Sequence, residues 1–408
     1  MNIVLYGINY SPELTGIGKY SGEMGDWLQR SGHRVSVITA PPYYPEWKVK
    51  EGFAGPRWHQ TDENGVKVTR CPLYVPNRVT ALKRLLHLSS FALSSFFPLM
   101  AQVRKKPDLV ILVAPTLFCA PAAWLLAKLS GATSVLHIQD YEVDALFGLG
   151  LARPGLLKRF AYACERFLLC RFDYLSTISS GMLKRAVDKG VPKERLVFFP
   201  NWSETHRFKE VDSSKVLLRK LGVPDGMQVL LYSGNMGDKQ GLEQVIEAAA
   251  RLQDKQKLFF LLVGDGAGKQ RLLEQAKKLH LDNVAFAPLQ PYEVLPVLLA
   301  SADVHLVVQR RGAADAVLPS KLTNILAVGG NAVITADPDT TLGLLCVEHP
   351  GIAICIEPES VDALLAGIDS ALAMPTKNSV AQAYASEFLD KERILQRFMK
   401  EVAQDVAD

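Results

Sequence analysis

Two lysines of the sequence stand where an anion could be bound. Lys239 lies in a polar turn, "SGNMGDKQG", between an apolar run and a helical segment, and Lys321 follows Ser320 in "LPSKLTN", which opens another helix. The first N–H groups of a helix are unpaired and carry the positive end of its dipole. A lysine beside such a helix start can hold a diphosphate without a metal ion. The sequence therefore predicts a metal-free diphosphate site in its second half.

A glycine-rich turn near the N-terminus is a second candidate anion site. In "NYSPELTGIGKY", Gly16 and Gly18 would let backbone N–H groups approach an anion at a helix expected to begin near Lys19. The turn lacks the third glycine of the dinucleotide motif, and the second strand, "RVSVITAPP", ends without the acidic residue that binds a ribose. No triphosphate-binding G-x-x-x-x-G-K-[ST] motif occurs around either turn. A glycine turn needed only for tight strand–helix packing is the alternative.

Apolar runs alternate along the chain with segments of helical periodicity, and these turns lie between them. "NIVLYG", "DLVILVAP", "QVLLYSGN" and "KLFFLLVGDG" are continuous apolar strands of the kind found in parallel sheets covered on both faces. Two such series predict an α/β fold of two Rossmann-like, doubly wound domains. We expect an N-terminal domain over residues 1–205, a second domain over 206–375, and a C-terminal helix over 376–408 that packs back toward the first domain.

Composition and charge limit the function classes. The 408 residues are 48% hydrophobic and 22% charged, as in ordinary folded proteins, and the six cysteines form no CxxC pair. They indicate reduced thiols of a cytosolic protein, and the strand-like start "MNIVLYG" predicts no signal peptide. Residues 1–200 carry 25 Lys and Arg against 15 Asp and Glu, whereas the rest carry 21 against 27. The dispersed basic residues favour a membrane surface or a phosphorylated substrate as partner, not nucleic acid.

Two segments interrupt the alternation. Residues 40–58, "APPYYPEWKVKEGFAGPRW", form a long Pro- and aromatic-rich loop, which is either functional or a plain surface excursion. Residues 82–106 are apolar between two basic flanks, but they are rich in Ser and contain Pro98, so we do not expect a membrane-spanning helix. A helix at the membrane interface and a buried helix of the first domain both fit this pattern.

The motifs together resemble those of the retaining glycosyltransferases of family 4, which have the two-Rossmann architecture called GT-B. The resemblance runs nearly end to end, through "SPELTGIGKY", "FFPNWSE", "YSGNMGDKQGLEQVIEAA", "LVGDG", "ASADVHLVV" and "LPSKLTNILAVGG". "YGINYSPELTGIGKY", "HIQDYEVDA" and "RGAADAVLPSKLTNILAVGGNAV" resemble more narrowly the bacterial exopolysaccharide enzymes assigned as fucosyltransferases of colanic acid assembly. This implies GDP-fucose as donor and a sugar on undecaprenyl diphosphate as acceptor. The enzyme would be peripheral on the inner face of the cytoplasmic membrane, with no cofactor and no metal.

The resemblance assigns the diphosphate of the donor to these cationic and glycine-bearing turns. Lys239, Lys321 with Ser320, and the Gly16–Gly18 loop would stabilise the charge that grows on the leaving group. Gly264 of "LVGDG" would also line the donor site. Family members usually have an arginine after the glycine of the Lys239 turn, where this chain has Asn235. Lys321 is expected to supply that missing charge.

The E-x7-E signature of similar enzymes is changed in this chain. Its two positions fall on Ala316 and Asn324. Asn324 can still hydrogen-bond a ribose hydroxyl, whereas Ala316 cannot act on the donor sugar, so Asp315 is the expected substitute. The change argues against covalent catalysis and favours front-face attack, in which the departing phosphate takes the acceptor proton.

On the acceptor side, the stretch "HIQDYEVD" ends a predicted strand. Related enzymes often have a His-Asp pair here, but this chain has Gln139-Asp140, so the histidine function is absent or moved to His137. Asp140 is the first candidate to orient the acceptor hydroxyl, and Glu142 and Asp144 are weaker ones. These three carboxylates fit a structural acidic turn better than a metal site, because no His or Cys has suitable spacing.

Glu13, just before the glycine loop, would contact the acceptor or cap the turn. Two other functions remain open at this point. One is a nucleotide-sugar epimerase or hydrolase on the same fold. The other is a non-catalytic module that binds sugar nucleotides or membranes.

Overall fold

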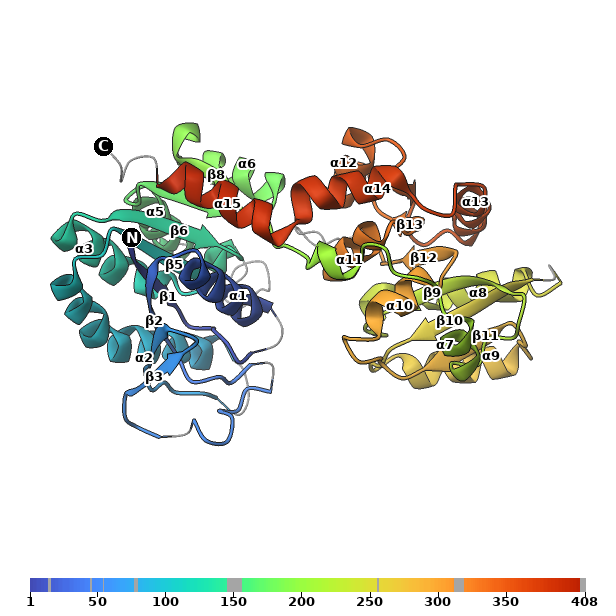
Figure 1. The fold of residues 1–408 in the computed structure, drawn as a ribbon, viewed down its shortest axis with the longest axis horizontal. Coiled ribbons are helices and arrows are strands. Elements are labelled where there is room, and N and C mark those ends of the chain that lie inside the picture. The colour runs from blue at the N-terminus through green and yellow to red at the C-terminus, as the bar shows by residue number, and fades with distance from the viewer. Residues whose placement is uncertain are drawn as a thin grey trace. The chain divides into compact units, whose positions relative to one another are not determined.

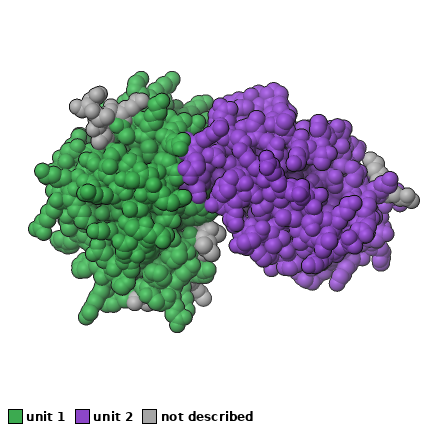
Figure 2. Space-filling model, in the orientation of Figure 1, with its two compact units in different colours: residues 1–201, 395–408 green, residues 202–394 purple. Residues whose placement is uncertain are grey.

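The computed structural model describes residues 1–13, 16–44, 46–53, 55–76, 80–144, 156–254, 257–311 and 319–403. The chain forms two compact units, residues 1–201 with 395–408, and residues 202–394 (Figure 2). Each unit contains one sheet flanked by helices (Figure 1). The predicted fold class, two Rossmann-like α/β domains, is confirmed.

Unit 1 is built on an eight-stranded sheet with the order β3-β4-β2-β1-β5-β6-β7-β8. Its neighbouring strands are parallel except for the antiparallel pair β3–β4. Every residue of β5, "LVILVA", is buried, as expected for a central strand covered on both faces. The strands are β1 (Asn2–Gly7), β2 (Arg34–Thr39), β3 (His59–Glu63), β4 (Val66–Arg70), β5 (Leu109–Ala114), β6 (Thr133–Ile138), β7 (Tyr174–Thr177) and β8 (Leu196–Phe198). The helices are α1 (Gly16–Arg30), α2 (Ala81–Met100), α3 (Ala120–Ser130), α5 (Leu156–Leu169) and α6 (Ser180–Asp188).

The β3–β4 hairpin has no counterpart in the predicted elements. Its two connecting residues, Asn64 and Gly65, both have positive φ, at 53° and 85°. An Asn-Gly pair in this conformation is the preferred two-residue hairpin turn. The hairpin follows the aromatic loop and forms one edge of the sheet.

Unit 2 is built on a six-stranded sheet with the order β11-β10-β9-β12-β13-β14, and its recorded strand pairs are parallel. The strands are β9 (Gln228–Ser233), β10 (Leu258–Val263), β11 (Val284–Ala287), β12 (Val304–Val307), β13 (Ala332–Thr335) and β14 (Ile354–Ile356). The helices are α7 (Lys215–Lys220), α8 (Glu243–Arg251), α9 (Lys269–Lys278), α10 (Leu295–Ala300), α11 (Ser320–Val328), α12 (Thr341–Glu348), α13 (Val361–Leu372) and α14 (Ser379–Tyr384). Helix α15 (Lys391–Val402) begins in unit 2, and its residues from Leu395 on belong to unit 1.

The sheet of unit 2 has a hydrophobic core on each face. One core takes buried side chains from α10, α11 and α12, namely Leu298, Leu322 and Leu342. The other takes them from α8, α9 and α13, namely Val245, Leu272 and Leu364. Because both faces are covered, the polar side chains that could bind a ligand are left to the strand ends and the turns that follow them.

Three boundaries can be compared with the sequence. Helix α11 begins at Ser320 and ends before Gly329, whose φ of 74° closes the helix, so this predicted helix is confirmed. Helix α1 begins at Gly16, earlier than the predicted start near Lys19, so Gly16 and Gly18 belong to its first turn. Unit 1 ends at residue 201 and resumes at 395, whereas the sequence suggested 205 and 376.

The turns after β9 and β10 touch through two glycines. Gly234 and Gly264 have φ of 149° and 152°, and a Cβ on Gly264 would overlap the carbonyl oxygen of Gly234. The Gly234 N–H also donates to the carbonyl of Val263, at 2.9 Å. Only glycine allows this approach, which fixes the two turns against each other.

Gly264→Ala is expected to destabilise the protein more than Gly226→Ala. Both glycines have positive φ, so each substitution costs about 1–2 kcal/mol for the backbone conformation. No atom lies within 4 Å of a Cβ on Gly226, whereas Gly264 adds an overlap with backbone, worth roughly 1–3 kcal/mol more. Urea unfolding measures the difference, and equal losses would contradict the packing argument.

Candidate functional site

In unit 2, Lys321 lies against the turn that follows β9. Its Cδ is 3.8 Å from the position of a Cβ on Gly234, and its ammonium is 4.7 Å from the ring centroid of Tyr232, a cation–π distance. The side chain is half-buried in the first turn of α11. The structure thus brings together two segments that are far apart in sequence and that the sequence analysis assigned to one site.

Lys321 borders a cavity of about 340 Å³. Asn324 also lines this cavity, three residues further along α11 and therefore on the same side of the helix. Asn324 Oδ1 accepts a hydrogen bond from Ser203 Oγ at 2.8 Å, which leaves the amide nitrogen as its donor to a ligand. The cavity is lined by Leu231, Ser233, Gly234, Leu289, Gln290, Tyr292, Leu295, Leu299, His305, Lys321, Asn324 and Ile325.

His305 of β12 is a cavity residue that the sequence analysis missed. Its side chain is 1% exposed, and neither ring nitrogen has a partner in the part of the chain that the structure describes. Burial lowers the pKa of His305 to about 4, so the ring is neutral at pH 7. A histidine inside the apolar run "ADVHLVV" was the only sequence signal.

The turn with Lys239 forms a short 3₁₀ segment, η5 (Asp238–Gln240), after β9. Lys239 is exposed, and its ammonium has no hydrogen-bond or ion-pair partner among the described residues. The exposed Asn235 accepts a bond from the Tyr232 hydroxyl through its backbone oxygen, at 2.5 Å. Its side chain lies over Gly266 in the turn after β10.

Some predicted donor-side residues cannot be placed. Asp315 and Ala316 lie outside the described residues, and only the backbone of Ser320 is described. Gly264 is placed, and its contact with Gly234 already accounts for a glycine there. A direct role of Gly264 in ligand binding stays a prediction.

In unit 1, Glu13 ties the segment after β1 to the segment after β2. It is 3% exposed, and its Oε1 accepts from the backbone N–H groups of Tyr43 and Tyr44, each at 3.0 Å. Its Oε2 accepts from Asn9 Nδ2 at 2.9 Å. Burial raises the pKa of Glu13, although these hydrogen bonds oppose the shift. The carboxylate therefore caps the turn, and contact with an acceptor stays a prediction.

Gly16 and Gly18 also have local structural reasons to be glycine. Gly16 has a φ of 61°, and a Cβ on Gly18 would lie 2.5 Å from Cβ of Glu13. Tight packing, the alternative left open by the sequence, is therefore present at Gly18. Anion binding by these two residues stays a prediction.

His137 and Gln139 form a buried network at the end of β6. His137 Nδ1 is 3.0 Å from Ser176 Oγ, and its Nε2 is 2.9 Å from Gln139 Nε2. Gln139 exchanges two side-chain hydrogen bonds with Asn201, both at 3.1 Å. Burial lowers the pKa of His137 to about 3. With its ring 2% exposed and both nitrogens occupied, His137 supports Gln139 in the described structure.

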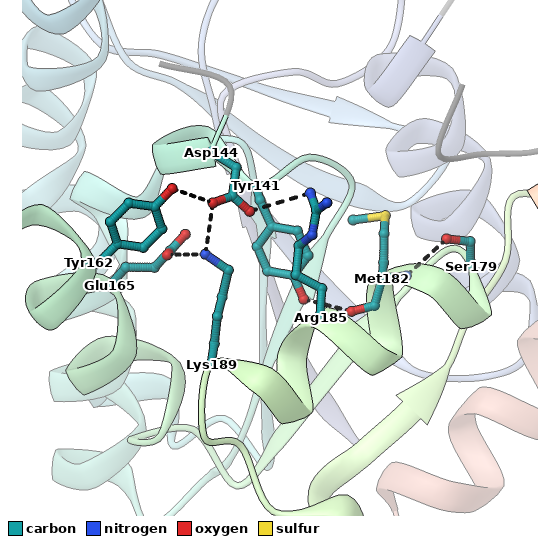
Figure 3. Close-up of polar contacts among 8 residues, drawn as sticks. All are labelled: Tyr141, Asp144, Tyr162, Glu165, Ser179, Met182, Arg185 and Lys189. Carbon is teal, nitrogen blue, oxygen red and sulfur yellow. Dashed lines mark hydrogen bonds and ion pairs between the residues drawn. The ribbon is translucent and has the colours of Figure 1, made fainter. Parts of the chain in front are cut away.

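The three carboxylates after β6 have different surroundings. Asp144 accepts hydrogen bonds from Tyr162, Arg185 and Lys189, at 2.8, 3.4 and 3.2 Å (Figure 3). Glu142 Oε2 accepts from the N–H of Leu117 at 2.7 Å, and burial raises the pKa of this carboxyl.

Asp140 is the exposed member of this group. It therefore stays the first candidate for contact with an acceptor. The described residues contain no cluster of three or more His, Cys, Asp or Glu side chains that could hold a metal ion.

Comparison with known proteins identifies the family. A "Glycosyl transferase 4-like domain" model matches residues 15–202, and a "Glycosyl transferases group 1" model matches residues 214–388. The chain is 59% identical, over 98% of its length and 100% of the relative, to the protein assigned as colanic acid biosynthesis glycosyl transferase WcaI of Escherichia coli (strain K12). The chain belongs to the group 1, or family 4, glycosyltransferases.

Solved structures show that this glycosyltransferase has the GT-B fold. A sucrose-phosphate synthase from Thermosynechococcus elongatus matches with a TM-score of 0.70 at 15% identity, over 100% of both chains. Anabaena Alr3699/HepE in complex with UDP matches with a TM-score of 0.65 at 15% identity, over 99% of this chain and 100% of that chain. The architecture expected from the resemblance is confirmed.

The buried histidines of the glycosyltransferase predict a loss of stability in mild acid. The pKa values of about 3 for His137 and 4 for His305 lie below the ordinary 6.5, so between these values the unfolded chain binds more protons than the folded chain. Each histidine then costs about 1.4 kcal/mol per pH unit, or roughly 2 kcal/mol at pH 5. In His305→Leu, the free energy of unfolding should fall less between pH 7 and pH 5 than in the wild type. Urea unfolding at both pH values measures this, and an unchanged pH dependence would refute it.

Proposed function

We propose that this glycosyltransferase moves a sugar, with retention, from a nucleotide-sugar donor to a lipid-linked oligosaccharide in colanic acid assembly. The observation that carries the proposal is the placement of Lys321 beside Gly234 at a cavity that Asn324 also lines. The reaction and pathway follow the family and the 59% identical E. coli relative. GDP-fucose as donor, and a sugar on undecaprenyl diphosphate as acceptor, rest on the sequence resemblance.

Unit 2 would bind the donor. As the glycosidic bond breaks, negative charge grows on the departing diphosphate, and cations held in place beforehand stabilise it. Lys321 supplies one cation next to the turn in which Asn235 replaces the usual arginine. Lys239, exposed and without a described partner, supplies the second. Asn324 would donate its amide N–H to a ribose oxygen.

Unit 1 would bind the acceptor. Asp140 is exposed at the end of β6, whereas Glu142 and Asp144 are only half-exposed. We assign Asp140 to orient the attacking hydroxyl. The proton of that hydroxyl passes to an oxygen of the departing phosphate in a front-face attack, so this route needs no protein nucleophile.

Lys239→Ala is expected to lower the rate of sugar transfer by about 10- to 150-fold, because a charged hydrogen bond is worth about 1.5–3 kcal/mol. The assay follows radiolabelled fucose from GDP-fucose onto a synthetic polyprenyl-diphosphate sugar. Lys277→Ala, which removes an exposed lysine near the end of α9, is the matched control. Full activity of Lys239→Ala would refute the diphosphate assignment, and turnover without acceptor would favour an epimerase or hydrolase.

We also propose that α2 holds the enzyme on the membrane surface. By length and composition, residues 82–105 are long and apolar enough to cross a membrane. Their structure favours an interfacial position, because one stripe of α2 is buried in unit 1 at His87, Phe91, Ser95 and Leu99.

The opposite side of α2 exposes an apolar stripe. Leu82, Leu86, Leu93 and Phe97 are 53–74% exposed, and their spacing of four, seven and four residues places them on one side of the helix.

Basic and aromatic residues surround this stripe in a way that suits an anionic membrane. Residues 81–106 contain no Asp or Glu and carry Lys or Arg at 83, 84, 104, 105 and 106. Each such residue near an anionic lipid surface adds about 1 kcal/mol of attraction. The exposed Trp58 donates its indole N–H to the carbonyl of Ser94, at 2.8 Å, which holds an interfacial aromatic residue against α2.

Leu86→Glu/Phe97→Glu is expected to abolish flotation of the protein with liposomes that contain anionic lipid. The two substitutions remove exposed apolar area and add negative charge, which an anionic membrane repels. Val347→Glu, at an exposed apolar residue of unit 2, should float like the wild type. A wild-type protein that stays in the soluble fraction at low salt would refute the membrane assignment.

A further inference from the structure

Two arginines from other elements hold the turn that carries Lys239. Arg310 follows β12, and Arg271 lies on α9. The turn itself extends from Asp238 to Gly241, shortly after β9 ends at Ser233, and both arginines contact it. This arrangement is independent of the Lys321 contact described above.

Arg310 acts on the backbone of the turn. Its Nε donates to the carbonyl of Asp238 at 2.7 Å, and its own backbone N–H donates to the carbonyl of Lys239 at 2.8 Å. Gly241 has a φ of 58°, and a Cβ there would lie 3.0 Å from Cγ of Arg310. The carbonyls on both sides of the Lys239 Cα are therefore held by Arg310, one by its side chain and one by its backbone N–H.

The same arginines bind the two carboxylates that are nearest to Lys239 in sequence, Asp238 and Glu243. Arg271 Nη2 donates to Asp238 Oδ1 at 2.8 Å and to Glu243 Oε1 at 2.6 Å. Arg310 Nη2 donates to Glu243 Oε2 at 3.2 Å. Asp238 directly precedes Lys239, so these bonds reduce the chance that a neighbouring carboxylate captures the Lys239 ammonium.

These pairs are partly exposed, and isolated surface ion pairs stabilise proteins little. A network that fixes backbone has a different effect, because it lowers the ordering cost of binding. With the turn held in place and its acids bound by arginines, the Lys239 ammonium has no hydrogen-bond or ion-pair partner in the part of the chain that the structure describes.

We infer that Arg310 is a positioning residue for Lys239, which it holds ready for the diphosphate of the donor. The inference rests on the proposed function of Lys239. Arg310 itself does not touch the ligand in this assignment. Removal of the Arg310 side chain should therefore weaken ligand binding only while Lys239 is present, and only for ligands that carry a diphosphate.

The test is a double-mutant cycle on ligand affinity, measured by calorimetry with GDP and UDP and with guanosine and uridine as ligands without diphosphate. Arg310→Ala should weaken binding of the tighter diphosphate about tenfold and leave binding of its nucleoside unchanged. Arg310→Lys should not restore affinity, because an ammonium cannot reproduce the several directed donors of a guanidinium. In Lys239→Ala, adding Arg310→Ala should cause no further loss.

Arg251→Ala is the control, because Arg251 also bridges two carboxylates of unit 2, Glu247 and Asp362. It should bind both ligands like the wild type. Two results would overturn the role of Arg310 without affecting that of Lys239. One is additive loss of affinity in the double variant, and the other is an equal loss of affinity for nucleoside and diphosphate in Arg310→Ala. A Lys239→Ala variant with unchanged diphosphate affinity would overturn both.

Discussion

Coverage of both sheet faces by helices is the constraint on which the other features depend. Strands such as β5 and β10 are buried along their whole length, so they cannot carry exposed polar side chains within the sheet. Parallel strands end at one edge, and the polar turns that follow them meet there. In unit 1 this brings Glu13 to the segment after β2, and in unit 2 it brings Gly234 to Gly264. The topology of the sheets thus determines where the candidate sites lie, and individual residues determine what they can bind.

The fold was predictable because its signals are local. The apolar run "LFFLLV" by itself predicts a buried strand. The Pro-Ser-Lys start and the Gly-Gly end of α11 by themselves predict the bounds of a helix. The β3–β4 hairpin was missed although Asn64-Gly65 is a strong turn signal, because the residues of β3, "HQTDE", are polar and none of them is buried. The start of α1 was misplaced because glycine is a poor helix former, so Gly16 and Gly18 suggested a loop.

The site was less predictable, because its contacts join distant segments. No local pattern shows that His305 faces a cavity under α10 and α11, or that Asn324 receives the hydroxyl of Ser203. Lys239 and Lys321 were predicted from a polar turn and a helix start, and Asn324 from a family motif, and the structure adds what surrounds them. For Glu13 and His137 it adds hydrogen-bond partners that explain their burial without a ligand.

The shared side of Lys321 and Asn324 on α11 has an electrostatic consequence. Against the family pattern, Asn235 removes one positive charge beside Gly234, and Asn324 removes one negative charge a single turn from Lys321. These two replacements change the formal charge in opposite senses, so together they leave it unchanged. Binding of a diphosphate by Lys321 would remain sensitive to salt, because it is an attraction between full charges.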